Sequence, residues 1–130
     1  MCACELKITT KSGGSEELFQ TQGVFEEDGE RERVRYLIEG DEGELLFSES
    51  ALEMHRRGKC GLQAVFREGE QGEMLLSDAA LQGKVPVRTT RYQLQKEQFQ
   101  RTIQLSYELF TAENIQTFTL KIQIFFSEEK

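Results

Sequence analysis

The stretch "FQRTIQLSYELF", residues 99–110, alternates apolar and polar side chains along almost its whole length. Its apolar members are Phe99, Ile103, Leu105, Tyr107 and Leu109, and the positions between them are polar or charged. Side chains at every second position of an extended chain point to the same face. We therefore expect a long β-strand here, with one face buried and the other in water.

The same period of two recurs along most of the chain. After a turn-rich break at Thr111–Asn114, residues 117–126 alternate in the same way, which predicts a hairpin near the C-terminal end. Shorter alternating runs occur in "ELKITTK" (5–11), "RVRYLIE" (33–39) and "CGLQAVF" (60–66). Ser77–Gly83 has the composition of a single helical turn, and the helical signal elsewhere is weak.

One run changes phase in its middle. In "KVPVRTTRYQLQ" (84–95), Val87 and Tyr92 lie an odd number of positions apart, so a regular strand would place them on opposite faces. A β-bulge inserts one extra residue and changes the phase of the residues beyond it. We therefore expect a bulge or bend near Thr89–Arg91, and we expect the sole proline, Pro86, near a strand start or edge.

Two similar segments of the sequence predict two hairpins with the same kind of turn. The segments "EGDEGELLFSESAL" (39–52) and "EGEQGEMLLSDAAL" (68–81) carry glycines and glutamates at matching positions. Glycine reaches the positive φ angles that tight turns need, and acidic side chains keep such turns in water. All these patterns together predict one all-β domain over residues 1–130, a small antiparallel closed β-barrel of about 8–10 strands.

Composition narrows the classes of function. The chain of 130 residues has a formal net charge of -7 and a pI near 4.9, which argues against binding nucleic acid or an anionic membrane. Apolar runs such as "IQIFF" (122–126) are too short to span a membrane, and the first residues lack a signal peptide's apolar stretch. The odd set of Cys2, Cys4 and Cys60 does not suit a secreted disulfide framework. We expect a cytoplasmic protein.

The segment "RRGKCGLQAVFREG" (56–69) resembles a family pattern. An R-x-G turn is followed by a phenylalanine and then by a further glycine, at Arg56, Gly58, Phe66 and Gly69. The later "TIQLSYEL" (102–109) looks like the long penultimate strand of the same pattern. The pattern is similar to that of the YwiB-like family of uncharacterised bacterial proteins.

The resemblance runs from about Tyr36 to Ile124, and its motifs are strand and turn positions. It implies a closed, calycin-like barrel, similar in architecture to lipocalins and fatty-acid-binding proteins, and it implies no known activity. At Arg101 the chain departs from the family, in which glycine is common.

Two arginines lie in phase with apolar positions. Arg101 shares a strand face with Ile103 and Tyr107, and Arg56 shares one with Met54. A guanidinium inside a barrel keeps its charge, so it needs an acidic partner, an anionic ligand or water at a rim. In fatty-acid-binding barrels an arginine and a tyrosine hold the ligand carboxylate, and Arg101 with Tyr107 resembles that pair. We take Arg56, Arg101 and Tyr107 as candidate ligand-binding residues.

The segment "MHRRGKC" (54–60) contains the only histidine, His55, and reads as the end of a strand followed by a turn. No nucleophile-elbow motif and no second histidine accompany His55, so we predict no catalytic residue and no enzyme activity. Cys2, Cys4, His55 and Cys60 could in principle bind zinc, but they lack the C-x-x-C spacing of a zinc knuckle. We expect neither a metal nor a cofactor.

Three functional hypotheses stay open. The first is binding of a small apolar or anionic ligand at the barrel mouth, which a cavity above ~300 Å³ would favour. The alternative is a protein–protein interaction module whose acidic loops, "EEDGERE" (26–32), "GDEGE" (40–44) and "GEQGE" (69–73), meet a basic partner. The third is an enzyme that uses carboxylates alone, which would need two facing acids in a cleft.

Overall fold

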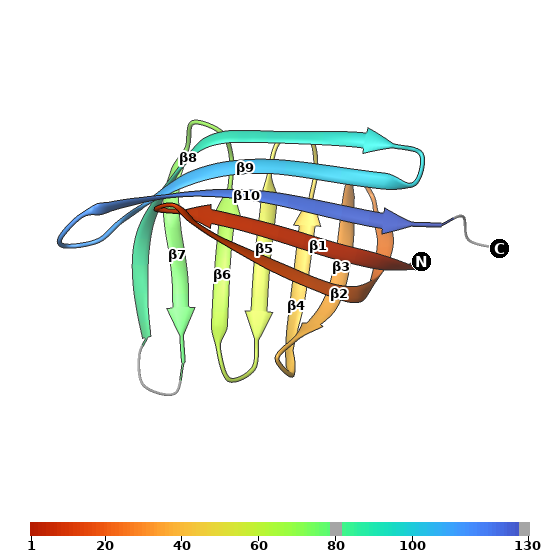
Figure 1. Cartoon of the computed structure of the whole chain (residues 1–130), viewed down its shortest axis with the longest axis horizontal. Helices are drawn as coiled ribbons and strands as arrows, with labels where there is room; N and C mark the ends of the chain where they lie inside the picture. Colours follow the sequence, from red (N-terminus) through yellow and green to blue (C-terminus); the bar gives the residue numbers. More distant parts are fainter. Residues whose placement is uncertain (79–81, 128–130) are drawn as a thin grey trace.

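The computed structural model describes residues 1–78 and 82–127, which form ten strands in one closed antiparallel barrel (Figure 1). Each strand pairs with the next along the chain, and β1 pairs with β10 to close the wall. None of the described residues belongs to a helix that could cross a membrane. The strands are β1 (Cys2–Ser12), β2 (Ser15–Asp28), β3 (Arg31–Ile38), β4 (Asp41–Phe47), β5 (Leu52–Arg57), β6 (Gly61–Phe66), β7 (Gln71–Ser77), β8 (Gln82–Glu97), β9 (Gln100–Phe110) and β10 (Ile115–Phe126).

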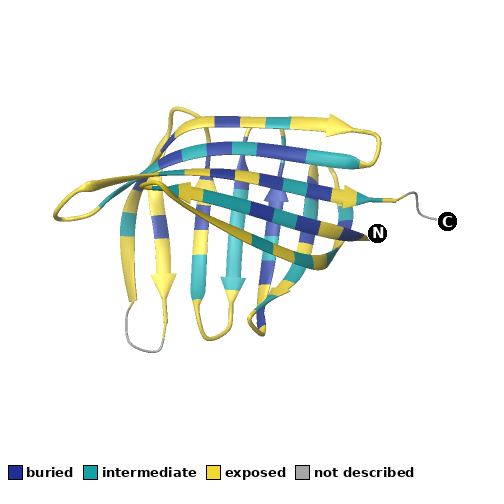
Figure 2. Cartoon of the chain, viewed as in Figure 1, coloured by how far each residue is buried: buried dark blue, intermediate teal, exposed yellow. Residues whose placement is uncertain are grey.

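The predicted all-β barrel is confirmed, and the alternation that predicts it is visible along the strands (Figure 2). Leu6, Val34 and Ile122 are fully buried, whereas the residues on either side of each are more exposed. Burying one such side chain contributes roughly 1.5–3 kcal/mol, so the shared interior is the main stabilising feature. The buried core comprises Cys4, Leu6, Ile8, Phe25, Val34, Leu45, Phe47, Leu52, Ala64, Phe66, Met74, Val87, Tyr92, Ile103, Leu105, Tyr107, Leu120, Ile122 and Ile124.

Two long strands turn the corners of the barrel. β2 pairs with β1 over its first part and with β3 only from Gly23 onward, where a Cβ would lie 2.7 Å from a carbonyl oxygen of β3. β8 pairs with β7 over its first part and with β9 from Val87 onward. Its register shifts between Thr89 and Arg91, which confirms the predicted bulge. A glycine and a bulge are the usual devices that let a strand bend from one sheet into another.

Several turn predictions are also confirmed. Thr111 donates its backbone N–H to the carbonyl oxygen of Asn114 at 2.9 Å in the β9–β10 turn. Gly40 and Gly69, at matching positions of the two segments, have φ angles of 84° and 80°, which confirms the expected positive φ of the turn glycine in both. Pro86 lies in the part of β8 that pairs with β7 alone, and it therefore has one free side.

Two local predictions are wrong. Phe99 lies in the β8–β9 turn and is 40% exposed, because the reversal takes place at Gln98 and Phe99 themselves. The ends of the predicted helical turn are strand, since Ser77 pairs with Gln82 across the β7–β8 hairpin and Gly83 belongs to β8. Residues 79–81, the middle of that turn, lie outside the described residues.

The barrel has two different ends. The turns that follow β1, β3, β5, β7 and β9 lie at one end, which we call the mouth end. The other turns, the start of β1 at Cys2 and the end of β10 at Phe126 lie at the opposite end, which we call the terminal end. Tyr92 helps to close the terminal end, because its hydroxyl donates to the carbonyl oxygens of Ser48 and Ala51 at 2.6 and 3.1 Å. The mouth end contains the cavity described below.

Candidate functional site

Arg101 belongs to the closure of the terminal end. Its Nε and Nη2 donate to the two carboxylate oxygens of Glu32 at 2.8 and 3.0 Å. Its Nη1 donates to the carbonyl oxygens of Glu97 and Gln100. Its guanidinium lies 5.1 Å from the centre of the Phe126 ring, within the range of a cation–π contact. The protein itself therefore satisfies the charge of Arg101 and leaves little of it for a ligand.

Arg56 holds the corresponding position at the mouth end. Its Nε donates to Oδ2 of Asp41 at 2.9 Å, and its Nη2 lies 3.6 Å from the Glu39 carboxylate. The backbone N–H groups of Lys59 and Cys60 donate to Asp41 at 2.9 and 3.1 Å. These backbone donors are the largest cause that lowers the pKa of Asp41 below its usual range, and Arg56 adds to their effect. Asp41 thus fixes Arg56 through one nitrogen, and the side chain of Arg56 lines the mouth cavity.

Tyr36, Gly43 and Arg56 are direct neighbours across β3, β4 and β5. The missing side chain of Gly43 makes room for the Tyr36 ring, because a Cβ at this glycine would overlap the ring. Burial raises the pKa of the Tyr36 hydroxyl, and the charge of Arg56 lowers it in part. The row therefore places a phenol and a guanidinium close together on the inner wall.

A cavity of about 530 Å³ opens over this row. The volume lies within the range of roughly 300–1,000 Å³ that is usual for small-molecule pockets. Tyr107 also lines it, with its ring stacked 5.3 Å from that of Phe118, and burial raises the pKa of Tyr107 to about 12. Among the described residues, neither Tyr36 nor Tyr107 has a hydrogen-bond partner for its hydroxyl. The apolar lining comprises Ile8, Leu18, Phe19, Ile38, Met54, Leu62, Phe66, Met74, Phe118 and Leu120.

The structure therefore brings two of the three predicted site residues together. Arg56 and Tyr107 line the mouth cavity, and Arg101 lies at the opposite end of the barrel. Tyr36 is a further lining residue that the sequence reasoning missed. Its signal was present, because a two-residue turn at Glu39–Gly40 pairs Tyr36 with a glycine and so leaves space above that glycine.

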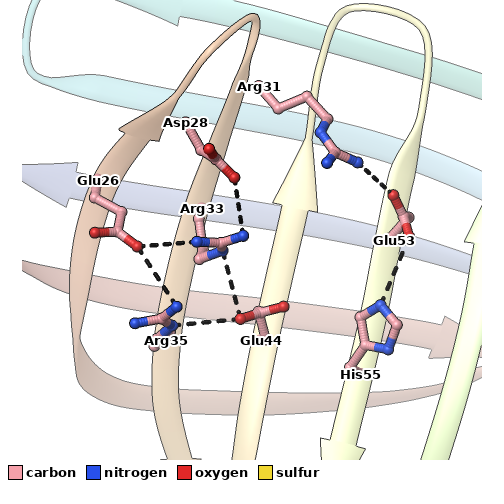
Figure 3. Close-up of polar contacts among 8 residues, drawn as sticks. All are labelled: Glu26, Asp28, Arg31, Arg33, Arg35, Glu44, Glu53 and His55. Atoms are coloured by element: carbon pink, nitrogen blue, oxygen red, sulfur yellow. Dashed lines mark hydrogen bonds and ion pairs between the residues drawn. The ribbon is translucent and has the colours of Figure 1, made fainter.

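A network of charged side chains covers the outer wall over β2–β5 (Figure 3). Arg33 lies at its centre, and its nitrogens lie 2.9–3.4 Å from carboxylate oxygens of Asp28, Glu26 and Glu44. His55 belongs to this outer face, where its Nε2 lies 3.7 Å from Glu53. The only histidine therefore has a carboxylate neighbour on the outside of the barrel.

The cysteines do not gather with His55. Cys4 is buried in the core and Cys60 is exposed in the β5–β6 turn. Burial, helped by the charge of Cys2, raises the pKa of the Cys4 thiol to about 11. In residues 1–78 and 82–127, no group of three or more His, Cys, Asp or Glu side chains is placed to hold a metal ion.

Two wider grooves, of about 670 and 950 Å³, lie on the outer wall. Arg57 lines both of them, and Arg35 and Glu42 line the smaller one. Their walls are mostly the solvent-facing sides of strands, although Arg56 and Leu62 border both the larger groove and the mouth cavity. A small molecule in either groove would keep much of its surface in water. The cavity inside the mouth is smaller but would remove more apolar ligand surface from water.

The three acidic loops do not form one surface. "EEDGERE" (26–32) and "GEQGE" (69–73) lie at the terminal end, whereas "GDEGE" (40–44) lies at the mouth end. In the first loop, Asp28 and Glu32 are also bound to arginines.

Comparison with known proteins agrees with this architecture. A family model described as a domain of unknown function, DUF1934, matches residues 4–124, which is more of the chain than the region Tyr36–Ile124 that carries the resemblance. The crystal structure of the YwiB protein from Bacillus subtilis has a similar fold, with a TM-score of 0.79 and 14% sequence identity over 97% of this chain and 91% of that chain. No curated protein matches the sequence. The chain belongs to the DUF1934 family, so its predicted kinship with the uncharacterised YwiB-like proteins is confirmed.

Proposed function

We propose that the protein binds a small, partly apolar molecule in the mouth cavity and does not convert it chemically. The observation that carries the proposal is the cavity of about 530 Å³ on the inner wall of the barrel. Its apolar side chains would contact the body of the ligand. The hydroxyls of Tyr36 and Tyr107 and the remaining donors of Arg56 would hold one oxygen-bearing end.

The charges around Arg56 limit which polar group the ligand can carry. Asp41 and Glu39 offset much of the positive charge of Arg56, and Glu17 adds a negative charge at the rim. A multiply charged group such as a phosphate would be repelled, whereas a carbonyl or a single carboxylate could accept hydrogen bonds from Arg56. The proposed ligand is therefore apolar over most of its surface and neutral or singly anionic at one end.

A cytoplasmic, non-catalytic role fits the remaining observations. His55 contacts Glu53 on the outer wall and also borders the mouth cavity. Among the described residues that line this cavity, no serine or cysteine could act as a nucleophile beside it, which supports a binding role over catalysis through this histidine. The odd number of cysteines supports a reducing compartment. The positions of the acidic loops at both ends lend no support to a single basic partner that meets all three.

A fluorescent apolar anion, anilinonaphthalene sulfonate, tests the proposal. Leu62 and Val65 lie on the same strand, β6, but Leu62 lines the cavity and Val65 is 45% exposed on the outer face. We expect Leu62→Trp to fill the cavity and weaken probe binding by at least about tenfold, whereas Val65→Trp changes it less than about twofold. Tight probe binding by the folded Leu62→Trp variant would place the probe elsewhere and contradict the proposal.

A second pair of variants tests the role of Arg56 within the same cavity. Removing Arg56 alone would leave Asp41 buried without its charged partner, so the informative variant is Arg56→Met combined with Asp41→Asn. Arg57→Met is the matched control, because Arg57 is the next residue and faces the outer wall. We expect the double variant to lose about tenfold in affinity for the sulfonate probe and the control to lose none. Equal affinity in both would remove Arg56 from the site.

A further inference from the structure

The wall of the barrel is incomplete along one side of β2. The ladder between β2 and β3 ends at the pair Gly23 and Tyr36, so Ser15–Gln22 pairs with β1 alone. β3 continues only to Ile38, and its last two residues pair only with β4. Figure 1 shows β2 diverging from β3 toward the β1–β2 turn. Beyond the β1 ladder, Ser15–Gln22 makes no backbone hydrogen bond to the described residues, so it presents a free strand edge.

Another free edge, on β8, contains residues that hinder the addition of a further strand. Gln82–Pro86 pairs with β7 alone, but the segment contains Lys84 and Pro86. Lysine and proline on an edge hinder the addition of another strand, the first by its charge and the second by its missing N–H. Ser15–Gln22 contains neither residue type. Its charges are Glu16 and Glu17, which would repel an acidic strand and attract a basic one.

Exposed apolar side chains flank the same opening. Leu18 projects from the free edge and is 56% exposed, and Leu37 on the neighbouring β3 is 64% exposed. Both project from the outer side of the wall, as their alternation with the inward-facing Phe19 and Tyr36 requires. Leu18 also borders the rim of the mouth cavity. A strand laid along β2 would pair with its backbone and cover Leu18 at the same time.

We propose that Ser15–Gln22 is a docking edge for an extended, basic segment of a partner protein, which adds to the barrel as a further strand. The main-chain groups of the edge supply hydrogen bonds, and the side chains set the sequence of the partner. Lysine or arginine is required opposite Glu16 and Glu17, and apolar residues opposite Leu18 and Phe19. The proposal does not require a ligand in the mouth cavity, although Glu17, Leu18 and Phe19 also border that cavity.

A capped peptide with the sequence Thr-Thr-Thr-Val-Val-Lys-Lys provides the probe, because in an antiparallel arrangement it places valines opposite Leu18 and Phe19 and lysines opposite Glu17 and Glu16. We expect the peptide to bind the full chain and to slow amide hydrogen exchange within Ser15–Gln22. We expect N-methylation of alternate peptide nitrogens to weaken binding by at least about tenfold, because it removes backbone donors. Absence of protection at this edge with millimolar peptide, or equal binding of the methylated peptide, would overturn the proposal.

Matched protein variants separate the edge from other exposed surface. Leu18 and Ile115 are 56% and 57% exposed, and each lies near a hairpin turn. We expect Leu18→Lys to weaken peptide binding by about tenfold and Ile115→Lys to change it less than about twofold. The reverse order would contradict the proposal. Sedimentation of the protein alone is the further control, because dimerisation through Ser15–Gln22 would make a second copy of the chain the occupant and would refute a basic partner.

Discussion

Arg56 and Arg101 face the barrel interior at opposite ends, and each is held by one buried carboxylate. The two pairs differ in what they leave available. Arg101 uses all three of its nitrogens in hydrogen bonds to the protein, whereas Arg56 is fixed through Nε and also lines a cavity. Arginine therefore helps to close the terminal end of the barrel and lines the candidate ligand cavity at the mouth end.

Breaking the Arg101 pair should destabilise the barrel strongly. Glu32→Gln leaves the Arg101 guanidinium, whose side chain is only 11% exposed, without its counter-charge. Breaking a buried pair in this way typically costs about 3 kcal/mol or more. Glu53→Gln is the control, since the Arg31–Glu53 pair has side-chain exposures of 46% and 31%. Pairs exposed in this way contribute about 0–1 kcal/mol. Urea unfolding of both variants measures the difference, and equal losses would show that the Glu32 pair is no more important than a surface pair.

Gly43 should be sensitive to the smallest substitution, and Gly72 should not. Gly43→Ala would force the Tyr36 ring away from the wall, with an expected loss of roughly 1–3 kcal/mol in the free energy of unfolding. Gly72→Ala meets open space in β7, so its stability should stay the same or rise by up to about 1 kcal/mol. Thermal and urea unfolding measure both effects. A stable Gly43→Ala protein with unchanged binding of the sulfonate probe would argue against the role of the Tyr36 ring.

Asp41 should contribute to loss of stability in acid. Its folded-state pKa lies below its usual range, so the unfolded chain takes up the proton first as the pH falls. The stabilisation is fully present above about pH 3.9, the ordinary aspartate pKa, and is lost as the pH falls from there through the folded-state pKa. We expect Asp41→Asn to be less stable at neutral pH and to show a shallower decline in acid. Parallel stability curves for the two proteins from pH 2 to pH 6 would contradict this.

At the scale of strands, β8 and β2 show what a sequence pattern can and cannot predict. The bulge in β8 was predictable because Val87 and Tyr92 both belong to the core and their phase conflict is visible in the sequence. The corner in β2 was not, because "SEELFQTQ" (15–22) contains few apolar residues from which a phase can be read. Gly23, which marks that corner, looks like any other strand glycine until the distance to β3 is known.

β2 should therefore behave as two segments in hydrogen exchange. Gly23–Phe25 pairs with strands on both sides, so its amides should be uniformly protected. In Ser15–Gln22, every second amide points away from β1, and we expect fast and slow exchange to alternate there. Residue-resolved exchange by NMR distinguishes the two patterns. Uniform protection of Ser15–Gln22 in the isolated protein would mean that the edge is already paired.

At the scale of the whole molecule, the alternation of apolar and polar residues was enough to predict the fold. It predicted the candidate site only in part. Period-two patterns predict a closed barrel because each strand has one face to bury. The same patterns place Arg56 and Arg101 on the inner face. They cannot show which of the two remains available to a ligand, because that depends on the buried partners Asp41 and Glu32 in other strands. The cavity could not be predicted either, because its volume depends on how side chains from several strands fill the mouth.

Native mass spectrometry of the freshly purified protein tests the central claim, that the barrel mouth holds a small molecule, most directly. We expect gentle ionisation to show a mass excess over the polypeptide that disappears on denaturation, and we expect it to be absent from Leu62→Trp and present in Val65→Trp. The bare polypeptide mass for the native protein under every gentle condition, or an excess that Leu62→Trp retains, would contradict the account.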